Sequence, residues 1–164
     1  IIALDVSSLN RMDDLGEELA ERAVPKILID HHLEPSGEDF ELIFSCTEVS
    51  STCELVYRIL KTWKPRTHLS KEQAVSLMTG LITDTNQFAN SVLPQTLEVA
   101  AHLMRYGADI NQIYALIYGT FSYSRMKLMG LALQKITIQT PFFALPKFSA
   151  NMPFINLQIR PVKE

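Results

Sequence analysis

The pattern of the first thirty or so residues predicts a strand, a helix and a second strand. It constrains the fold more than any other feature of the sequence. Residues 1–4 (IIAL) form an apolar run too short for a helix. An amphipathic segment opens with Asp13 and Asp14 and closes before Pro25, and residues 26–29 form a second β-prone run. Such a unit has parallel neighbouring strands joined by a right-handed crossover. The sequence therefore predicts an α/β class with a parallel sheet in a Rossmann-like, three-layer domain.

The remainder of the chain is predominantly helical by pattern. A third strand is expected at residues 40–44, and Ser51 with Glu54 has the spacing of a capping box that opens a helix running to about Trp63. Further caps, prolines and glycines mark a helix from residue 71 that ends within residues 83–86, and helices at residues 94–106, 110–119 and 122–136. After residue 136 the apolar residues show neither a helical nor a strand periodicity. We therefore expect one domain over residues 1–136, with a helical C-terminal half, and an unassigned tail over residues 137–164.

The composition of the chain limits which kinds of molecule it is expected to bind. The chain has 164 residues, of which 47% are hydrophobic, and a formal net charge of −3 without a long basic block. This balance argues against holding long duplex nucleic acid by surface charge and is compatible with a small anionic substrate. Cys46 and Cys53 are too few for a disulfide framework, which favours the cytoplasm, and no apolar run predicts a membrane span. Because Ile1 already lies in a predicted strand, we expect the sequence to begin inside a domain.

Acids and imidazoles stand where the apolar segments end. Asp5 follows the first strand, Asp30, His31 and His32 follow the second, and Asp84 closes a helical apolar segment. One polar residue at such a place commonly only caps the strand, but parallel neighbours bring Asp5 and the Asp-His-His run to one sheet edge, where open α/β sheets bind ligands. Carboxylates with a minority of histidine suit Mn²⁺ or Mg²⁺ better than a structural zinc.

This ligand set favours phosphate chemistry. Two divalent ions sharing a bridging carboxylate can activate a water and neutralise a phosphoryl group during in-line attack. No serine or cysteine nucleophile paired with a base, and no glycine-rich phosphate loop, is evident in the sequence. His68 and His102 have no partner motif and are interpreted as surface or hydrogen-bonded histidines.

At these residues the chain resembles the DHH family of phosphoesterases, named after the tripeptide at positions 30–32. The resemblance covers about residues 1–135 and includes residues 1–8 with Arg11, residues 50–54 (SSTCE), residues 80–85 (GLITDT) and residues 94–109. Within the family, the chain looks most like the bacterial nanoRNase and pAp-phosphatase branch, which also has relatives acting on linear or cyclic dinucleotides.

The resemblance implies roles for individual residues. Asp5 matches the carboxylate that bridges two metal ions, and His31 and Asp84 match ligands of one ion. Asp30 matches an acid that orients an imidazole, and His32 matches a histidine near the second metal and the substrate phosphate. Weaker candidates for substrate contacts are Arg11, Ser51 and Thr52. The cofactor implied is a pair of Mn²⁺ ions, with Mg²⁺ as the alternative.

The chain also departs from the family pattern. Family members have an upstream strand with a His and two Asp that complete both metal sites, and a C-terminal domain that binds the nucleotide, and the present residues match neither. We therefore expect an internal part of a catalytic domain that binds metal weakly and turns over little. The expected activity of the family is hydrolysis of short oligoribonucleotides or pAp-like nucleotides, and a homodimer is a family expectation.

Two alternatives remain open at this point. One is an inorganic pyrophosphatase or an exopolyphosphatase of the same fold, which differs only in the leaving group. The other is a non-catalytic module that keeps the fold and binds a nucleotide or a protein.

Overall fold

A small parallel sheet stands at the start of the chain. The structure is a computed structural model that describes residues 1–134, 138–139 and 142–143. The strands are β1 (Ile2–Leu4), β2 (Ile27–Asp30) and β3 (Leu42–Ser45), hydrogen-bonded in the order β1-β2-β3 and parallel throughout. Ile2 pairs with Ile27, and Ile27 pairs with Leu42. The predicted β-α-β unit is therefore confirmed, and the carboxyl ends of all three strands lie along one edge.

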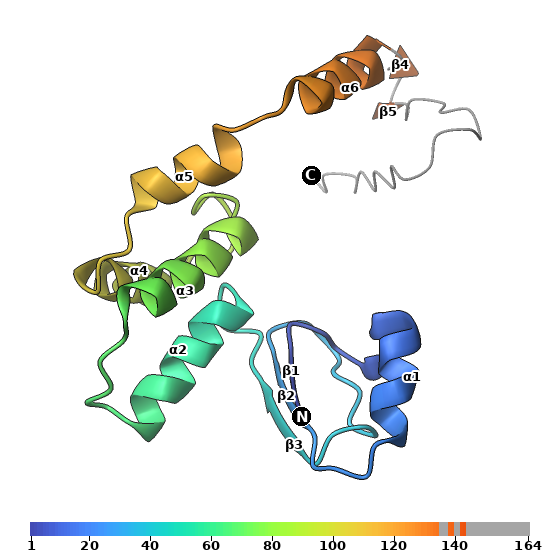
Figure 1. Cartoon of the computed structure of the whole chain (residues 1–164), viewed down its shortest axis with the longest axis vertical. Helices are drawn as coiled ribbons and strands as arrows, with labels where there is room; N and C mark the ends of the chain where they lie inside the picture. The colour runs from blue at the N-terminus through green and yellow to red at the C-terminus, as the bar shows by residue number, and fades with distance from the viewer. Residues whose placement is uncertain (135–137, 140–141, 144–164) are drawn as a thin grey trace. The chain divides into compact units, whose positions relative to one another are not determined.

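One face of the sheet carries a hydrophobic core. Ala3 of β1 and Leu28 of β2 pack with Leu9 and Phe40, and the partly buried Leu19 and Ile43 join them. Leu9 belongs to a short 3₁₀ helix, η1 (Leu9–Met12), which leads directly into α1 (Asp13–Glu21) beside the sheet (Figure 1). The third strand begins two residues later than predicted, because Phe40 is buried in this core and pairing with β2 starts at Leu42.

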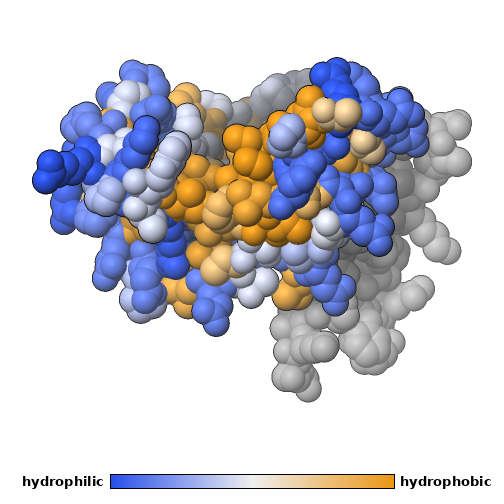
Figure 2. All heavy atoms as spheres, turned by 90° about the horizontal axis from the view of Figure 1, so that it is seen from below, coloured by the Kyte–Doolittle hydropathy of each residue, from blue (hydrophilic) through white to orange (hydrophobic). Residues whose placement is uncertain are grey.

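The alternate residues of the strands point to the other face, which is exposed in part. The exposed side chains there are large and apolar, namely Ile2, Leu4, Leu42 and Phe44. Figure 2 shows hydrophobic atoms gathered in the middle of one face of the molecule, between hydrophilic surfaces. Helix α2 (Thr52–Trp63) contacts β2.

Helices dominate the chain after the sheet, as predicted. Helix α2 packs against α3 (Lys71–Asp84) and α4 (Pro94–Arg105), and α5 (Ile110–Tyr118) follows (Figure 1). The helix starts at Ser51 and Ser70 match the sequence, since each hydroxyl accepts the amide N–H three residues on. Helix α3 buries one apolar stripe completely, formed by Ala74, Met78, Leu81 and Ile82.

The chain divides into two units, residues 1–114 and residues 115–164. Described parts of the second unit include α6 (Tyr123–Gln134) and a two-stranded antiparallel pair, β4 (Ile138–Gln139) with β5 (Phe142–Phe143). The predicted domain boundary at residue 136 lies outside the described residues, as does all of the predicted tail except these two strands. Among the described residues, no helix has the length and hydropathy that a membrane span requires.

Candidate metal centre

Asp5 follows β1 in a backbone conformation that residues other than glycine seldom adopt. Its φ is +62°, in the left-handed region, and its N–H donates to the carbonyl of Ile29 across 3.1 Å. The hydroxyl of Thr52, the first residue of α2, donates to Asp5 Oδ1 over 2.7 Å. Strained backbone of this kind persists where the surroundings hold it, and it is concentrated at functional sites. The carboxylate of Asp5 is thus fixed by its strand neighbour and by the start of a helix.

Asp30 ends β2 and is completely buried. Its Oδ1 accepts the N–H of His31 over 2.9 Å and lies 2.8 Å from Nδ1 of the His32 ring. Because Asp30 Oδ1 accepts, a neutral His32 carries its proton on Nδ1 and leaves the lone pair on Nε2. The buried Asp30 Oδ2 has no hydrogen-bond partner among the described residues. Asp30 therefore holds the imidazole of His32, and its role beside a metal ion stays a prediction.

The His31 imidazole lies between two carboxylates from different elements. Its Nε2 is 3.7 Å from Asp5 Oδ1 and also 3.7 Å from Asp84 Oδ2, at the end of α3. Asp5, His31 and His32 each offer one ligand atom, and these atoms lie within 4.8 Å of one another. The ends of two strands and of one helix thus bring the five predicted residues into one cluster. Within it, Asp84 lies next to His31.

The electrostatics of this cluster favour a cation. Partial burial and the nearby carboxylate of Asp5 raise the pKa of Asp84, while His31 and His32 act in the opposite direction. Burial, together with Asp84 and Asp5, also raises the pKa of the Cys53 thiol. Burial is the larger cause of both shifts, and the neighbouring carboxylates add negative charge that a bound divalent cation would offset.

The residues present fit a divalent metal ion. The 3.7 Å separations exceed hydrogen-bond length, whereas two ligand atoms that share an ion at about 2.1 Å lie roughly 3 to 4 Å apart. Carboxylate oxygen and imidazole nitrogen are the donors that such ions take. Asp5, His31 and His32 offer ligand atoms close enough to one another to hold one ion, and Asp84 lies beside the same site, 3.7 Å from His31 Nε2.

The predicted substrate-binding residues take different positions. Arg11 is exposed in η1, and its Nη1 donates to Ser7 Oγ over 3.3 Å. Ser51 is buried, and its hydroxyl caps α2 by accepting the N–H of Glu54. Thr52 contacts Asp5. Their roles in substrate binding remain predictions.

A buried glutamate behind the cluster was predicted only as a helix cap. Glu54 Oε2 accepts hydrogen bonds from the Ser50 N–H (3.0 Å), the Ser50 hydroxyl (2.6 Å) and the Thr96 hydroxyl of α4 (2.8 Å). Its Oε1 pairs with Arg58 one turn later. Burial alone would raise the pKa of Glu54, but the hydrogen bonds from Ser50 and Thr96 and the charge of Arg58 outweigh it, so that the pKa is lowered.

Two further features of this region depend on how the helices pack. The Thr96 bond joins residues 42 positions apart. Cys53 packs against Gly80 of α3 so closely that a Cβ added at position 80 would lie 2.2 Å from the Cys53 Sγ. The partners in these contacts depend on how α2, α3 and α4 pack, although the capping spacing of Ser51 and Glu54 and the glycine at position 80, which permits close approach of a neighbour, pointed to the place.

Parts of the chain are similar to known proteins. Residues 1–81 match the family described as "DHH family, N-terminal domain". The chain is 34% identical over 99 residues to the cyclic-di-AMP phosphodiesterase GdpP of Geobacillus thermodenitrificans, a match that covers 58% of this chain and 15% of that protein. It is 27% identical over 99 residues to the cyclic-di-AMP phosphodiesterase PdeA of Listeria monocytogenes, with the same two shares.

A solved structure is also similar. The crystal structure of an exopolyphosphatase-related protein from Bacteroides fragilis superposes with a TM-score of 0.79 and 35% sequence identity, over 85% of this chain and 41% of that one. The chain thus spans less than half the length of each of these three relatives.

Proposed function

Because residues 1–81 match the N-terminal domain of the DHH family, we propose that this chain holds the metal centre of a phosphoesterase that acts on short nucleotides. One observation carries the proposal: His31 Nε2 lies 3.7 Å from a carboxylate oxygen of Asp5 and 3.7 Å from one of Asp84. The proposed bonds are the phosphodiester or phosphomonoester bonds of short single-stranded oligoribonucleotides and pAp-like nucleotides, and the proposed cofactor is Mn²⁺.

The metal supplies one part of the chemistry. When bound, a divalent ion of this kind polarises a phosphoryl oxygen and lowers the pKa of a bound water toward neutrality. The residues of the chain supply orientation. Thr52 fixes one oxygen of Asp5, and Asp30 fixes the tautomer of His32 so that its Nε2 lone pair faces away from the buried carboxylate. His32 is the more exposed of the two imidazoles, which suits a group that meets the substrate phosphate.

Metal binding tests the proposal without relying on turnover. We expect calorimetric titration with Mn²⁺ to show a binding heat that Asp84→Asn weakens at least about tenfold, since a ligand is lost. Asp14→Asn is the matched control, because Asp14 is an exposed acid in the first turn of α1. Equal Mn²⁺ affinities in the two variants would contradict the proposal.

A substrate panel with Mn²⁺ then separates the substrate classes. Because this chain is expected to turn over little, the expected outcome is slow hydrolysis of a short oligoribonucleotide or pAp that is lost in Asp84→Asn. Cyclic-di-AMP belongs in the panel because two of the relatives are named as its phosphodiesterases. Release of phosphate from polyphosphate alone would instead favour the exopolyphosphatase alternative, for which the similarity to the Bacteroides fragilis protein is the supporting observation.

A further inference from the structure

A second cavity lies between α2 and α4, away from the metal cluster. It has a volume of about 610 Å³, within the size range of small-molecule sites, and is lined by Tyr57, Lys61, Pro65, His102, Arg105 and Tyr106. Thr52, the residue of α2 that contacts Asp5, precedes Lys61 by nine residues, so the two places are about 13 Å apart along the helix.

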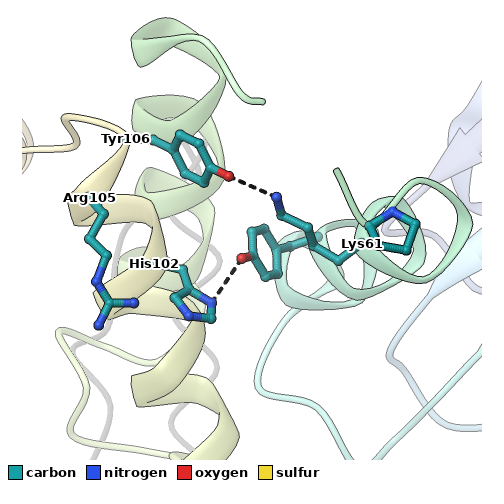
Figure 3. Close-up of a pocket in the computed structure, with 6 residues that line it drawn as sticks. Lys61, His102, Arg105 and Tyr106 are labelled. Carbon is teal, nitrogen blue, oxygen red and sulfur yellow. Dashed lines mark hydrogen bonds between the residues drawn. The ribbon is translucent and has the colours of Figure 1, made fainter. Parts of the chain in front are cut away.

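The side chains in this cavity converge from two helices. In Figure 3, His102 of α4 and Tyr106, which directly follows α4, point toward α2, and dashed lines mark their contacts. Tyr57 Oη lies 3.0 Å from His102 Nδ1, and Lys61 Nζ donates to Tyr106 Oη over 2.8 Å and to the carbonyl of Thr67 over 2.7 Å. Lys61 Nζ is also 5.0 Å from the centroid of the Tyr106 ring. These contacts place the ammonium group of Lys61 at a defined position beside two aromatic rings.

The positive charge of the cavity is not compensated by nearby acids. None of its lining residues is acidic, and in the described part of the chain Lys61, His102 and Arg105 form no ion pair with a carboxylate. The Arg105 guanidinium is exposed and, within that same part, donates no side-chain hydrogen bond. Lys61 and Arg105 place two cationic groups at one cavity, in a chain of net charge −3, and therefore mark a local site for an anion.

We propose that this cavity binds a small organic phosphate with a planar aromatic part, such as a nucleoside monophosphate. Arg105 and Lys61 recognise the phosphate, because a guanidinium fork and an ammonium group both form charge-assisted hydrogen bonds to it. The ring of Tyr106, with Pro65, supplies an apolar wall for the planar part, whereas Tyr57 is only 5% exposed and supports the site from beneath through His102. The site requires no metal ion, which separates it from the cluster of Asp5 and His31.

Titration of the whole chain with AMP in the presence of EDTA tests the site. We expect calorimetry to show binding that Arg105→Gln weakens by about tenfold, the loss of one charge-assisted hydrogen-bonding group. Two variants should keep the wild-type affinity: Lys64→Gln, which removes a cation outside the cavity, and Asp84→Asn, which disables the proposed metal site. Arg105 is exposed, so circular dichroism should show Arg105→Gln folded.

Inorganic phosphate and adenosine separate the two halves of the recognition. Phosphate should bind more weakly than AMP, and adenosine should bind more weakly still. No AMP binding in EDTA, or an unchanged affinity in Arg105→Gln, would overturn the site. Phosphate binding as tight as AMP binding would overturn the role of the aromatic wall, and adenosine binding as tight as AMP binding would overturn the role of the basic groups.

Discussion

Replacing Glu54 by glutamine tests whether the buried carboxylate holds α2 and α4 together. The carboxylate accepts three hydrogen bonds, two from Ser50 and one from Thr96. A hydrogen bond to a charged acceptor is worth about 1 kcal/mol more than one to a neutral acceptor, so three such bonds amount to about 3 kcal/mol. We therefore expect Glu54→Gln to lower the free energy of unfolding by about 3 kcal/mol at pH 7, a large part of a domain's total stability.

Glu18 provides a matched control for this experiment. It also pairs with an arginine four residues away, Arg22, but both side chains of that pair are more than half exposed. An exposed pair of this kind contributes less than about 1 kcal/mol. Urea unfolding followed by circular dichroism measures both variants. If Glu54→Gln costs no more than Glu18→Gln, the carboxylate is not the link between the helices.

The same substitution has a defined pH dependence. Because the pKa of Glu54 is lowered in the folded state, the unfolded state binds more protons between the folded and the ordinary pKa. The stability that the carboxylate provides is therefore complete above the ordinary glutamate value of about 4.3 and is lost as the pH falls through the folded pKa. The stability difference between wild type and Glu54→Gln should be constant at neutral pH and shrink below about pH 4.

Three smaller predictions concern neighbouring contacts. Gly80→Ala places a Cβ 2.2 Å from the Cys53 Sγ, so we expect it to cost about 1 to 3 kcal/mol in urea unfolding, and the added substitution Cys53→Ala to restore part of that loss. Ser70→Ala removes the capping hydroxyl of α3 and should cost about 1 kcal/mol, measured as a lower Tm. Thr52→Val removes the hydroxyl that holds Asp5, so Mn²⁺ affinity in calorimetry should fall at least about tenfold, whereas Thr52→Ser should keep it.

The parts of the fold that depend on short-range patterns could be predicted from the sequence. The parallel strands followed from the apolar runs on either side of one amphipathic segment, and the start of α3 followed from Ser70 and Gln73, whose reciprocal hydrogen bonds are present. The same reasoning placed Asp5 beside the carboxyl end of β2, because parallel neighbours share an edge.

Features that depend on long-range packing or on backbone strain had no such signal. The hydrogen bond from Thr96 to Glu54 depends on the packing of α4 against α2. The left-handed backbone at Asp5 is open to aspartate more than to most residues other than glycine, but its surroundings select it at this position. After α3, three consecutive residues, Asn86, Gln87 and Phe88, also have positive φ, which periodicity does not predict. The residues that line the cavity at Lys61 come from separate segments, and the sequence pattern of each segment predicts only ordinary helix surface.

Helix α2 connects these features physically. Its first residue, Thr52, holds the carboxylate of Asp5, and Glu54, two residues later, receives the hydrogen bond of Thr96 from α4. Farther along, the same helix contributes Lys61 to the cavity whose opposite wall belongs to α4. Because a helix is stiff over this length, a shift of α4 against α2 would change the support of Asp5 and the width of the cavity together. Substitutions at Glu54 should therefore weaken Mn²⁺ binding and AMP binding in parallel, whereas Thr52→Val should affect only Mn²⁺.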